Sequence, residues 1–189
     1  HLRYADYILE RMEEARVCFP YLENLYLKTQ ETAFYAKLSE TVCTDVVLCG
    51  YTNTEVSIAR GHQLPLHASA AGKVILAFLD ETQKNRILEN EPLTKLTRYT
   101  ITDREELEGE FSRIQVDGRG FSIEEMNERI NALATPVFAR GKGVVGAISL
   151  VGWSKNLDKD TLNAYADEFL VSRRKITPQL GGTFPLHLS

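Results

Sequence analysis

The sequence predicts an α+β fold, an antiparallel sheet with helices packed against it. Segments with the alternating pattern of β-strands gather in two groups, one before residue 60 and one after residue 118. Helix-periodic segments precede, separate and follow these groups. Regular alternation of strand and helix, which would indicate a parallel sheet, is absent. The 189 residues, 43% of them hydrophobic, suffice for one large domain with a helical extension.

Helical and then extended segments make up the first third of the chain. Apolar residues from Ala5 to Phe19 recur at helical spacing, and Pro20 predicts that this helix breaks there. A shorter helix is expected to follow to Tyr26. The polar turn 52–54 predicts an antiparallel hairpin between its two neighbouring strands. The strands expected in this third cover residues 32–38, 45–51 and 55–59.

The rest of the chain predicts helices, a second hairpin and a final helix. Thr102 and Glu105 form a capping box for one helix, and Asp158 or Asp160 can cap the last. Gly181 and Gly182 follow the last helical apolar residue and end it. The expected helices reach Phe78, cover 81–90, reach Val116 and run to Leu180, and the expected strands cover 133–138 and 144–151 around the turn 140–143.

Composition excludes several classes of function. A net charge of −4 provides no basic surface for nucleic acid, and no run approaches the roughly 18 apolar residues of a membrane span. Cys18, Cys43 and Cys49 include no CxxC pair, and their odd number argues against a closed disulfide framework. We therefore expect a cytoplasmic protein that does not bind DNA through this chain alone.

Residues 64–78, LPLHASAAGKVILAF, predict a ligand-binding helix N-terminus. The stretch is not a phosphate-binding P-loop, because His67 and Val74 stand where that motif needs glycine and a hydroxyl residue. Small residues nevertheless lead into a helix whose free N–H groups and dipole attract anions. A carboxylate would fit as well as a phosphate. Close packing of small residues is the alternative explanation.

Other polar residues give weaker signals. His67 and Ser69 stand two positions apart, which rarely directs both side chains to one place, so no catalytic residues are assigned. Lys73 is expected to be a solvated helix residue. Glu124, Glu125 and Glu128 lack a histidine at metal-ligand spacing, so neither a metal nor another cofactor is expected.

Three segments together resemble one known family. LPLHASAAGKVILAFL, RYTITDREELEGEFSRIQVDGRGFSIEE and LATPVFARGKGVVGAISLVG stand in an order and spacing similar to the C-terminal effector-binding domain of IclR-type bacterial transcription regulators. The resemblance runs from about Glu31 to Gly182 and implies a GAF-like domain that binds a small metabolite, expected to be a carboxylic acid. It implies the divisions 1–30 for linker and N-terminal helices, 31–182 for the effector-binding domain and 183–189 for the tail.

The resemblance also implies partners and a binding site. The chain would form a dimer or tetramer and would contact DNA only through a separate N-terminal winged helix-turn-helix domain, with no membrane involved. The implied effector-binding residues surround one cavity between sheet and helices. They are Val56, Leu64, Ser69, Ala70 and Ala71 near the helix entrance, and Ser122, Ile130, Ala132, Ser149 and Val151 on the far side.

Departures from the family pattern bear on the ligand. Ser122, Ala132 and Val151 stand where glyoxylate-responsive and pyruvate-responsive members have Asp, Cys and Ser, so we expect a larger or less polar effector. Arg129 replaces a usual glycine and could either stay solvated or reach a ligand carboxylate. Two rival functions remain: a small GAF-like hydrolase or isomerase acting on a small acid, and a platform that serves only for oligomerisation.

Overall fold

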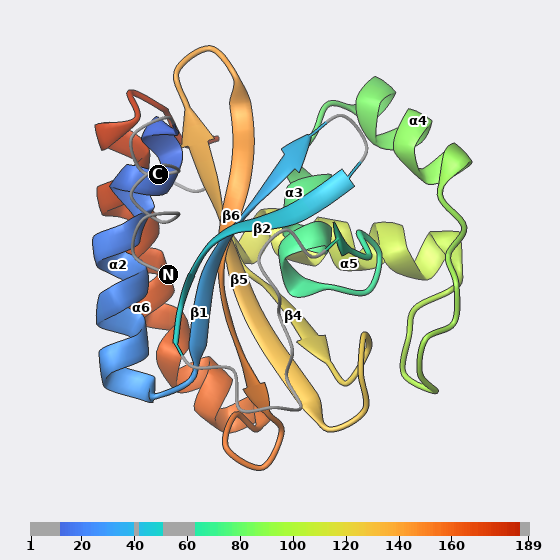
Figure 1. Ribbon diagram of the computed structural model, residues 1–189. Helices are drawn as coiled ribbons and strands as arrows, with labels where there is room; N and C mark the ends of the chain where they lie inside the picture. Colours follow the sequence, from blue (N-terminus) through green and yellow to red (C-terminus); the bar gives the residue numbers. More distant parts are fainter. Residues whose placement is uncertain (1–11, 40–41, 51–62, 186–189) are drawn as a thin grey trace.

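The computed structural model describes residues 12–39, 42–50 and 63–185. Its centre is one six-stranded sheet in the order β3-β2-β1-β6-β5-β4, in which all neighbours are antiparallel (Figure 1). The predicted α+β class and the hairpin around residues 140–143 are therefore confirmed. The strands are β1 (Thr32–Ser39), β2 (Val42–Cys49), β3 (Gln63–Leu64), β4 (Gly120–Ile123), β5 (Ile130–Ala139) and β6 (Gly143–Trp153).

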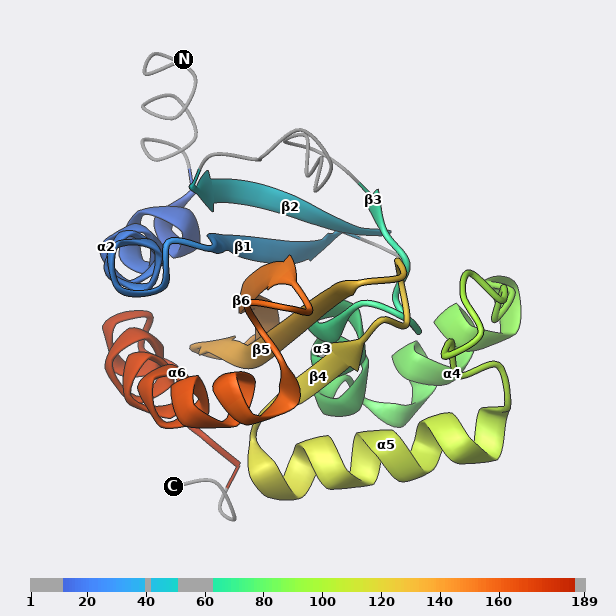
Figure 2. The same ribbon diagram turned by 90° about the horizontal axis from the view of Figure 1, so that it is seen from below.

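Helices cover both faces of the sheet, as the view from below shows (Figure 2). Two long helices pack on one face and three shorter ones lie on the other. Side chains of β1 point alternately to the two faces of the sheet. Ala33 and Tyr35 belong to one hydrophobic core, and Phe34 and Ala36 belong to the other. The helices are α2 (Glu13–Thr29) and α6 (Lys159–Gln179) on the first face, and α3 (Ala70–Phe78), α4 (Glu81–Asn90) and α5 (Arg104–Asp117) on the second.

The predicted break at Pro20 is wrong, because α2 continues through it. Proline removes one intrahelical hydrogen bond, a local cost that tertiary packing can outweigh. Here Cys18, Leu22 and Leu25 are fully buried on both sides of the proline. One apolar face against the sheet thus stabilises an uninterrupted helix. Ala5 lies outside the described residues.

The predicted cap of α5 is displaced by one residue. The side chain of Asp103, not that of Thr102, accepts a hydrogen bond from the Glu106 N–H at 2.9 Å. Asp158 caps α6 by accepting from Thr161 N–H at 2.8 Å, which resolves the choice left open with Asp160. Both caps follow the preference for aspartate before the first helical turn.

The observed strand boundaries differ most from the predicted ones in the first third of the chain. The strand expected over residues 45–51 is β2, which covers Val42–Cys49 and pairs with β1. The strand expected over residues 55–59, with its turn 52–54, lies outside the described residues. The divisions at residues 30 and 182 remain predictions. Among the described helices, none is long and apolar enough to cross a membrane.

Candidate functional site: the entrance to helix α3

Helix α3 begins with a well-formed cap. The Ser69 hydroxyl accepts a hydrogen bond from the Gly72 N–H at 3.1 Å and donates one to the Pro65 carbonyl at 2.8 Å. The preceding turn is closed by the Ser69 N–H, which donates to the same carbonyl at 3.0 Å. Ala70 and Ala71 are the first two helical residues, whose amides have no carbonyl inside the helix to bond. They are the amides that the sequence predicts for anion binding.

Gly72 allows the entrance loop to fold tightly against α3. A Cβ at this position would lie 2.6 Å from both the Cα and the carbonyl oxygen of Leu66. It would also lie 2.7 Å from the Ser69 hydroxyl oxygen. Glycine is therefore required for close approach of two backbone segments rather than for an unusual backbone conformation.

The far-side residues of the predicted site form rows across the sheet. Ser122 on β4 is opposite Ala132 on β5, and Ala132 is opposite Val151 on β6. Ser149 is two residues from Val151, and Ile130 is two residues from Ala132, so all five face the same side. Val151, Ile130 and Ala132 belong to the core that also contains Leu64, Ala70 and Ala71. Sheet and helix entrance therefore meet at one apolar layer.

Two predicted serines already donate hydrogen bonds within the protein. The Ser122 hydroxyl donates to the Ala68 carbonyl at 2.7 Å and so ties β4 to the entrance loop. The Ser149 hydroxyl donates to the Leu133 carbonyl at 2.9 Å, and Ser149 is fully buried. Each hydroxyl oxygen keeps lone pairs that can accept. Their immediate role in this structure is to hold the sheet and the loop together.

The remaining residues predicted for the site differ in their surroundings. Val56 lies outside the described residues. Leu64 is buried and also lines a surface groove of about 410 Å³, with Leu66, Leu96 and Met126 among its other walls. Val151 lines a different hollow beside Thr32. The described residues thus bring nine predicted positions to one side of the sheet.

The expectation that Lys73 is solvated is wrong. Its side chain is fully buried, and its ammonium nitrogen lies 2.7 Å from each carboxylate oxygen of Glu125. A second carboxylate, Glu110, lies 3.6 Å away. The pair joins α3 to the loop after β4, so Glu125 has a structural role in this fold. A signal existed in the sequence: small and apolar residues surround Lys73 and leave this helix no polar face.

Electrostatics around this pair are dominated by burial. Burial raises the pKa of the Glu125 carboxyl above its ordinary value, and the opposing attraction of Lys73 limits the rise. The Ile123 N–H also donates to this carboxylate at 3.3 Å. The main-chain carbonyl of Glu125 accepts from the Thr100 hydroxyl at 2.7 Å. These contacts fix the β4 end that faces the entrance of α3.

His67 and the other glutamates occupy structural positions. The His67 ring nitrogen Nε2 lies 2.9 Å from the Thr94 carbonyl, so its contact is with the main chain of the segment after α4. The Glu124 carboxylate accepts from the Arg129 N–H at 2.8 Å and closes the loop before β5. Glu128 is exposed. Among the described residues no group of three potential ligands could hold a metal ion.

Arg129 adopts the left-handed backbone region with φ of 64°. Its side chain is exposed, as the solvated alternative expects. A non-glycine residue in this region costs roughly 1–2 kcal/mol. The conformation gives a physical reason why a glycine suits this position.

Replacing Arg129 with glycine is expected to raise the free energy of unfolding by up to about 1 kcal/mol, because the relieved strain outweighs the entropy that the unfolded chain gains. Urea unfolding of both proteins measures the difference. Lys155→Gly is the control, since Lys155 is exposed and has no positive φ. It should lower the stability slightly. Equal changes in the two variants would contradict the assigned strain.

Comparison with known proteins identifies the fold and then the family. The profile described as "Bacterial transcriptional regulator IclR C-terminal" matches residues 7–177. The HTH-type transcriptional regulator KdgR of Escherichia coli is 31% identical over 121 residues, which are 64% of this chain and 46% of that protein. The transcriptional repressor IclR of Escherichia coli is 28% identical over 170 residues, 88% of this chain and 62% of that protein. The chain spans about half the length of these relatives.

Solved structures agree with this assignment. The C-terminal domain of Escherichia coli KdgR superposes with a TM-score of 0.79 and 27% identity, covering 90% of this chain and 99% of that one. The inducer-binding domain of a PobR double mutant from Acinetobacter, crystallised with 3-hydroxybenzoic acid, gives a TM-score of 0.77 and 24% identity over 86% of this chain and 96% of that one.

The class defined by this fold is a GAF-like α+β domain with a curved antiparallel sheet. The chain belongs to the IclR family of bacterial transcriptional regulators and represents its C-terminal domain. The resemblance seen in the sequence is confirmed.

Proposed function

We propose that this domain senses a small carboxylic acid and passes the signal to a separate DNA-binding domain of a cytoplasmic regulator. The acid group is bound at the amides of Ala70 and Ala71, and its body lies against Leu64, Ile130, Ala132 and Val151. Ser122 and Ser149 edge the site, with Val56 as a further apolar wall. The observation that carries the proposal is the capped α3 entrance facing an apolar row of the sheet.

The related PobR domain supports an aromatic or similarly sized acid, because its structure contains 3-hydroxybenzoic acid. The apolar side chains of Ala132 and Val151 suit such a body better than a two-carbon acid. Binding acts on DNA by favouring one arrangement of a homodimer or homotetramer, since a ligand shifts an equilibrium only through unequal affinity for its states. Relatives that are regulators favour binding over the alternative of catalysis on a small acid.

Thermal unfolding with 3-hydroxybenzoate tests the site. At about 100 times its dissociation constant the acid should stabilise the protein by about 2.7 kcal/mol, which raises the melting temperature by roughly 5–10 °C. The amide 3-hydroxybenzamide is the neutral probe and should have little effect. The acid should emerge unchanged from the incubation, because turnover would instead support the enzyme.

Ala132→Leu is expected to abolish this stabilisation, because it adds bulk at a half-buried position opposite Val151, where the body of the acid is proposed to lie. Ala164→Leu, on the exposed surface of α6, is the control and should bind the acid as the unaltered protein does. An Ala132→Leu protein that is stabilised as strongly as the control would contradict this placement. If a panel of small acids fails to stabilise the unaltered protein, the oligomerisation platform is the better account.

A further inference from the structure

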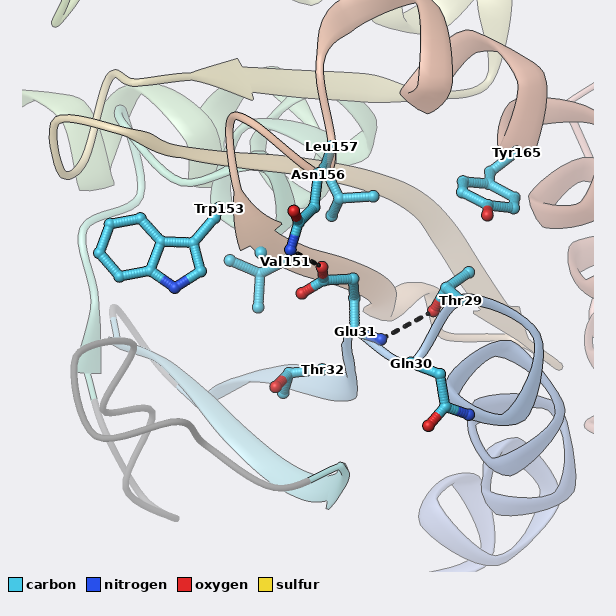
Figure 3. A pocket seen from close by; sticks show the side chains of 10 residues that line it. Thr29, Gln30, Glu31, Thr32, Val151, Trp153, Asn156, Leu157 and Tyr165 are labelled. Carbon is cyan, nitrogen blue, oxygen red and sulfur yellow. Dashed lines mark hydrogen bonds between the residues drawn. The ribbon is translucent and has the colours of Figure 1, made fainter.

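A second hollow lies on the sheet between the end of α2 and the start of α6 (Figure 3). Its volume is about 310 Å³, near the lower end of the range for small-molecule sites. The ten residues that line it include one carboxylate, Glu31, and no lysine, arginine or histidine. The hollow is therefore negatively charged and mainly polar.

The Glu31 carboxylate is held in place by hydrogen bonds, but no basic side chain of the described residues neutralises its charge. The Asn156 amide donates to its Oε1 atom at 2.8 Å, and the Glu31 N–H donates to the Thr29 hydroxyl at 3.1 Å. Within residues 12–39, 42–50 and 63–185 no basic side chain pairs with Glu31. Lys28, three residues earlier, pairs with Glu168 on α6 instead. The described part of the chain thus leaves one carboxylate oxygen of Glu31 without a cationic partner.

Gly152 makes room for this carboxylate. A Cβ on Gly152 would lie 2.3 Å from the Glu31 Oε2 atom and 2.7 Å from its carboxyl carbon. Any larger residue would force Glu31 away from β6. The absence of a side chain at Gly152 therefore keeps the carboxylate against the floor of the hollow.

Two further features favour a cation. The hollow lies at the C-terminus of α2, where Gln30 is the cap residue and the helix dipole is negative. Figure 3 shows Glu31 between the rings of Trp153 and Tyr165, which stand on opposite sides of the hollow. Aromatic faces attract ammonium groups and cover their attached carbon chains. Charge, dipole and aromatic walls all select the same kind of ligand.

We propose that this hollow is a binding site for a small primary alkylammonium ion, whose charge is matched by Glu31. The N–H groups of such an ion can donate to the Glu31 carboxylate oxygen that does not accept from the Asn156 amide. The alkyl part lies along Trp153 and Leu157. This site binds a ligand of opposite charge to that proposed for the α3 entrance, and Val151 is the one residue that the two proposals share.

The chain carries a single tryptophan, Trp153, so its fluorescence reports on this hollow directly. Titration of the unaltered chain with n-butylammonium chloride should give a saturable change in that fluorescence. Equal additions of n-butanol or sodium chloride should not. Absence of saturation, or the same saturation with n-butanol, would overturn the proposal without any variant.

Glu31→Gln keeps a side chain of the same size and should weaken n-butylammonium binding about tenfold or more, because a charge-assisted bond is lost. Glu23→Gln removes the same charge from an exposed position of the preceding helix α2 and should leave binding unchanged. Equal affinity in the two variants would show that Glu31 does not hold the cation. Stabilisation by 3-hydroxybenzoate is measured in the same proteins. Loss of n-butylammonium binding alone then concerns the hollow at Glu31, and loss of the response to 3-hydroxybenzoate alone concerns the α3 entrance.

Discussion

Replacing Lys73 with methionine is expected to lower the free energy of unfolding by about 3–5 kcal/mol, because it breaks a buried ion pair by removing one partner. The ammonium group is fully buried and lies 2.7 Å from both oxygens of Glu125. Methionine fills a similar volume but leaves the Glu125 carboxylate without its main charge partner. Urea unfolding at neutral pH measures the loss.

Lys84→Met is the matched control. Lys84 is also buried, but its partners Glu81 and Glu108 have side chains that are 72% and 36% exposed. Water can solvate these carboxylates after the lysine is removed, so the expected loss is about 1 kcal/mol or less. Similar losses in the two variants would show that burial of Glu125 does not set the cost.

The Lys73→Met defect should depend on pH in a defined direction. Burial already raises the pKa of Glu125 above 4.5, and removing Lys73 removes an interaction that lowers it. A carboxyl whose pKa is raised on folding costs no stability below its unfolded pKa, and the cost grows as pH rises through the folded pKa. The variant should therefore be closer to the unaltered protein at roughly pH 5 than at roughly pH 8. A larger defect in acid would contradict this assignment.

Replacing Gly72 with alanine is expected to cost about 1–3 kcal/mol or more and to abolish stabilisation by the acid. The new Cβ would meet the Leu66 backbone at 2.6 Å, so either the loop or the first turn of α3 must move. Either movement displaces Ser69 and the amides of Ala70 and Ala71. Unfolding measurements with and without 3-hydroxybenzoate give both quantities.

Gly109→Ala is the control for Gly72→Ala. Gly109 lies in α5, and a Cβ there would meet no atom within 4 Å. Alanine should stabilise this helix by about 0.5–1 kcal/mol, because it lowers the entropy of the unfolded chain. Opposite signs for the two glycines are the expected result. A stabilising Gly72→Ala change would mean that the loop is less tightly packed than the structure shows.

Local sequence patterns predicted those elements whose signals are local. Helix α4 has the predicted bounds, because Asp80 can cap its start and Pro92 follows its end. The second hairpin was predictable from a glycine turn between β-rich runs. The predicted helix break at Pro20 was wrong, because the cost of a proline is local. The apolar face that keeps α2 intact packs against a distant part of the chain, which local sequence does not reveal.

The arrangement of the residues proposed for the site was predictable in outline only. The resemblance located the α3 entrance and its facing strands, and the register of β4, β5 and β6 places those residues together. Lys73 and Glu125 could not be paired in this way, because 52 residues separate them along the chain. The carboxylate of Glu31 was missed for the same reason: its surroundings come from α2, β6 and the turn after it.

The most direct test of the central claim is a ¹⁵N NMR titration with 3-hydroxybenzoate. The acid should shift the amide signals of Ala70 and Ala71 most strongly, followed by those of Ala132 and Val151, as expected for a carboxylate at the α3 N-terminus. Shifts confined to other residues, such as Leu96 and Met126 of the neighbouring groove, would contradict the account.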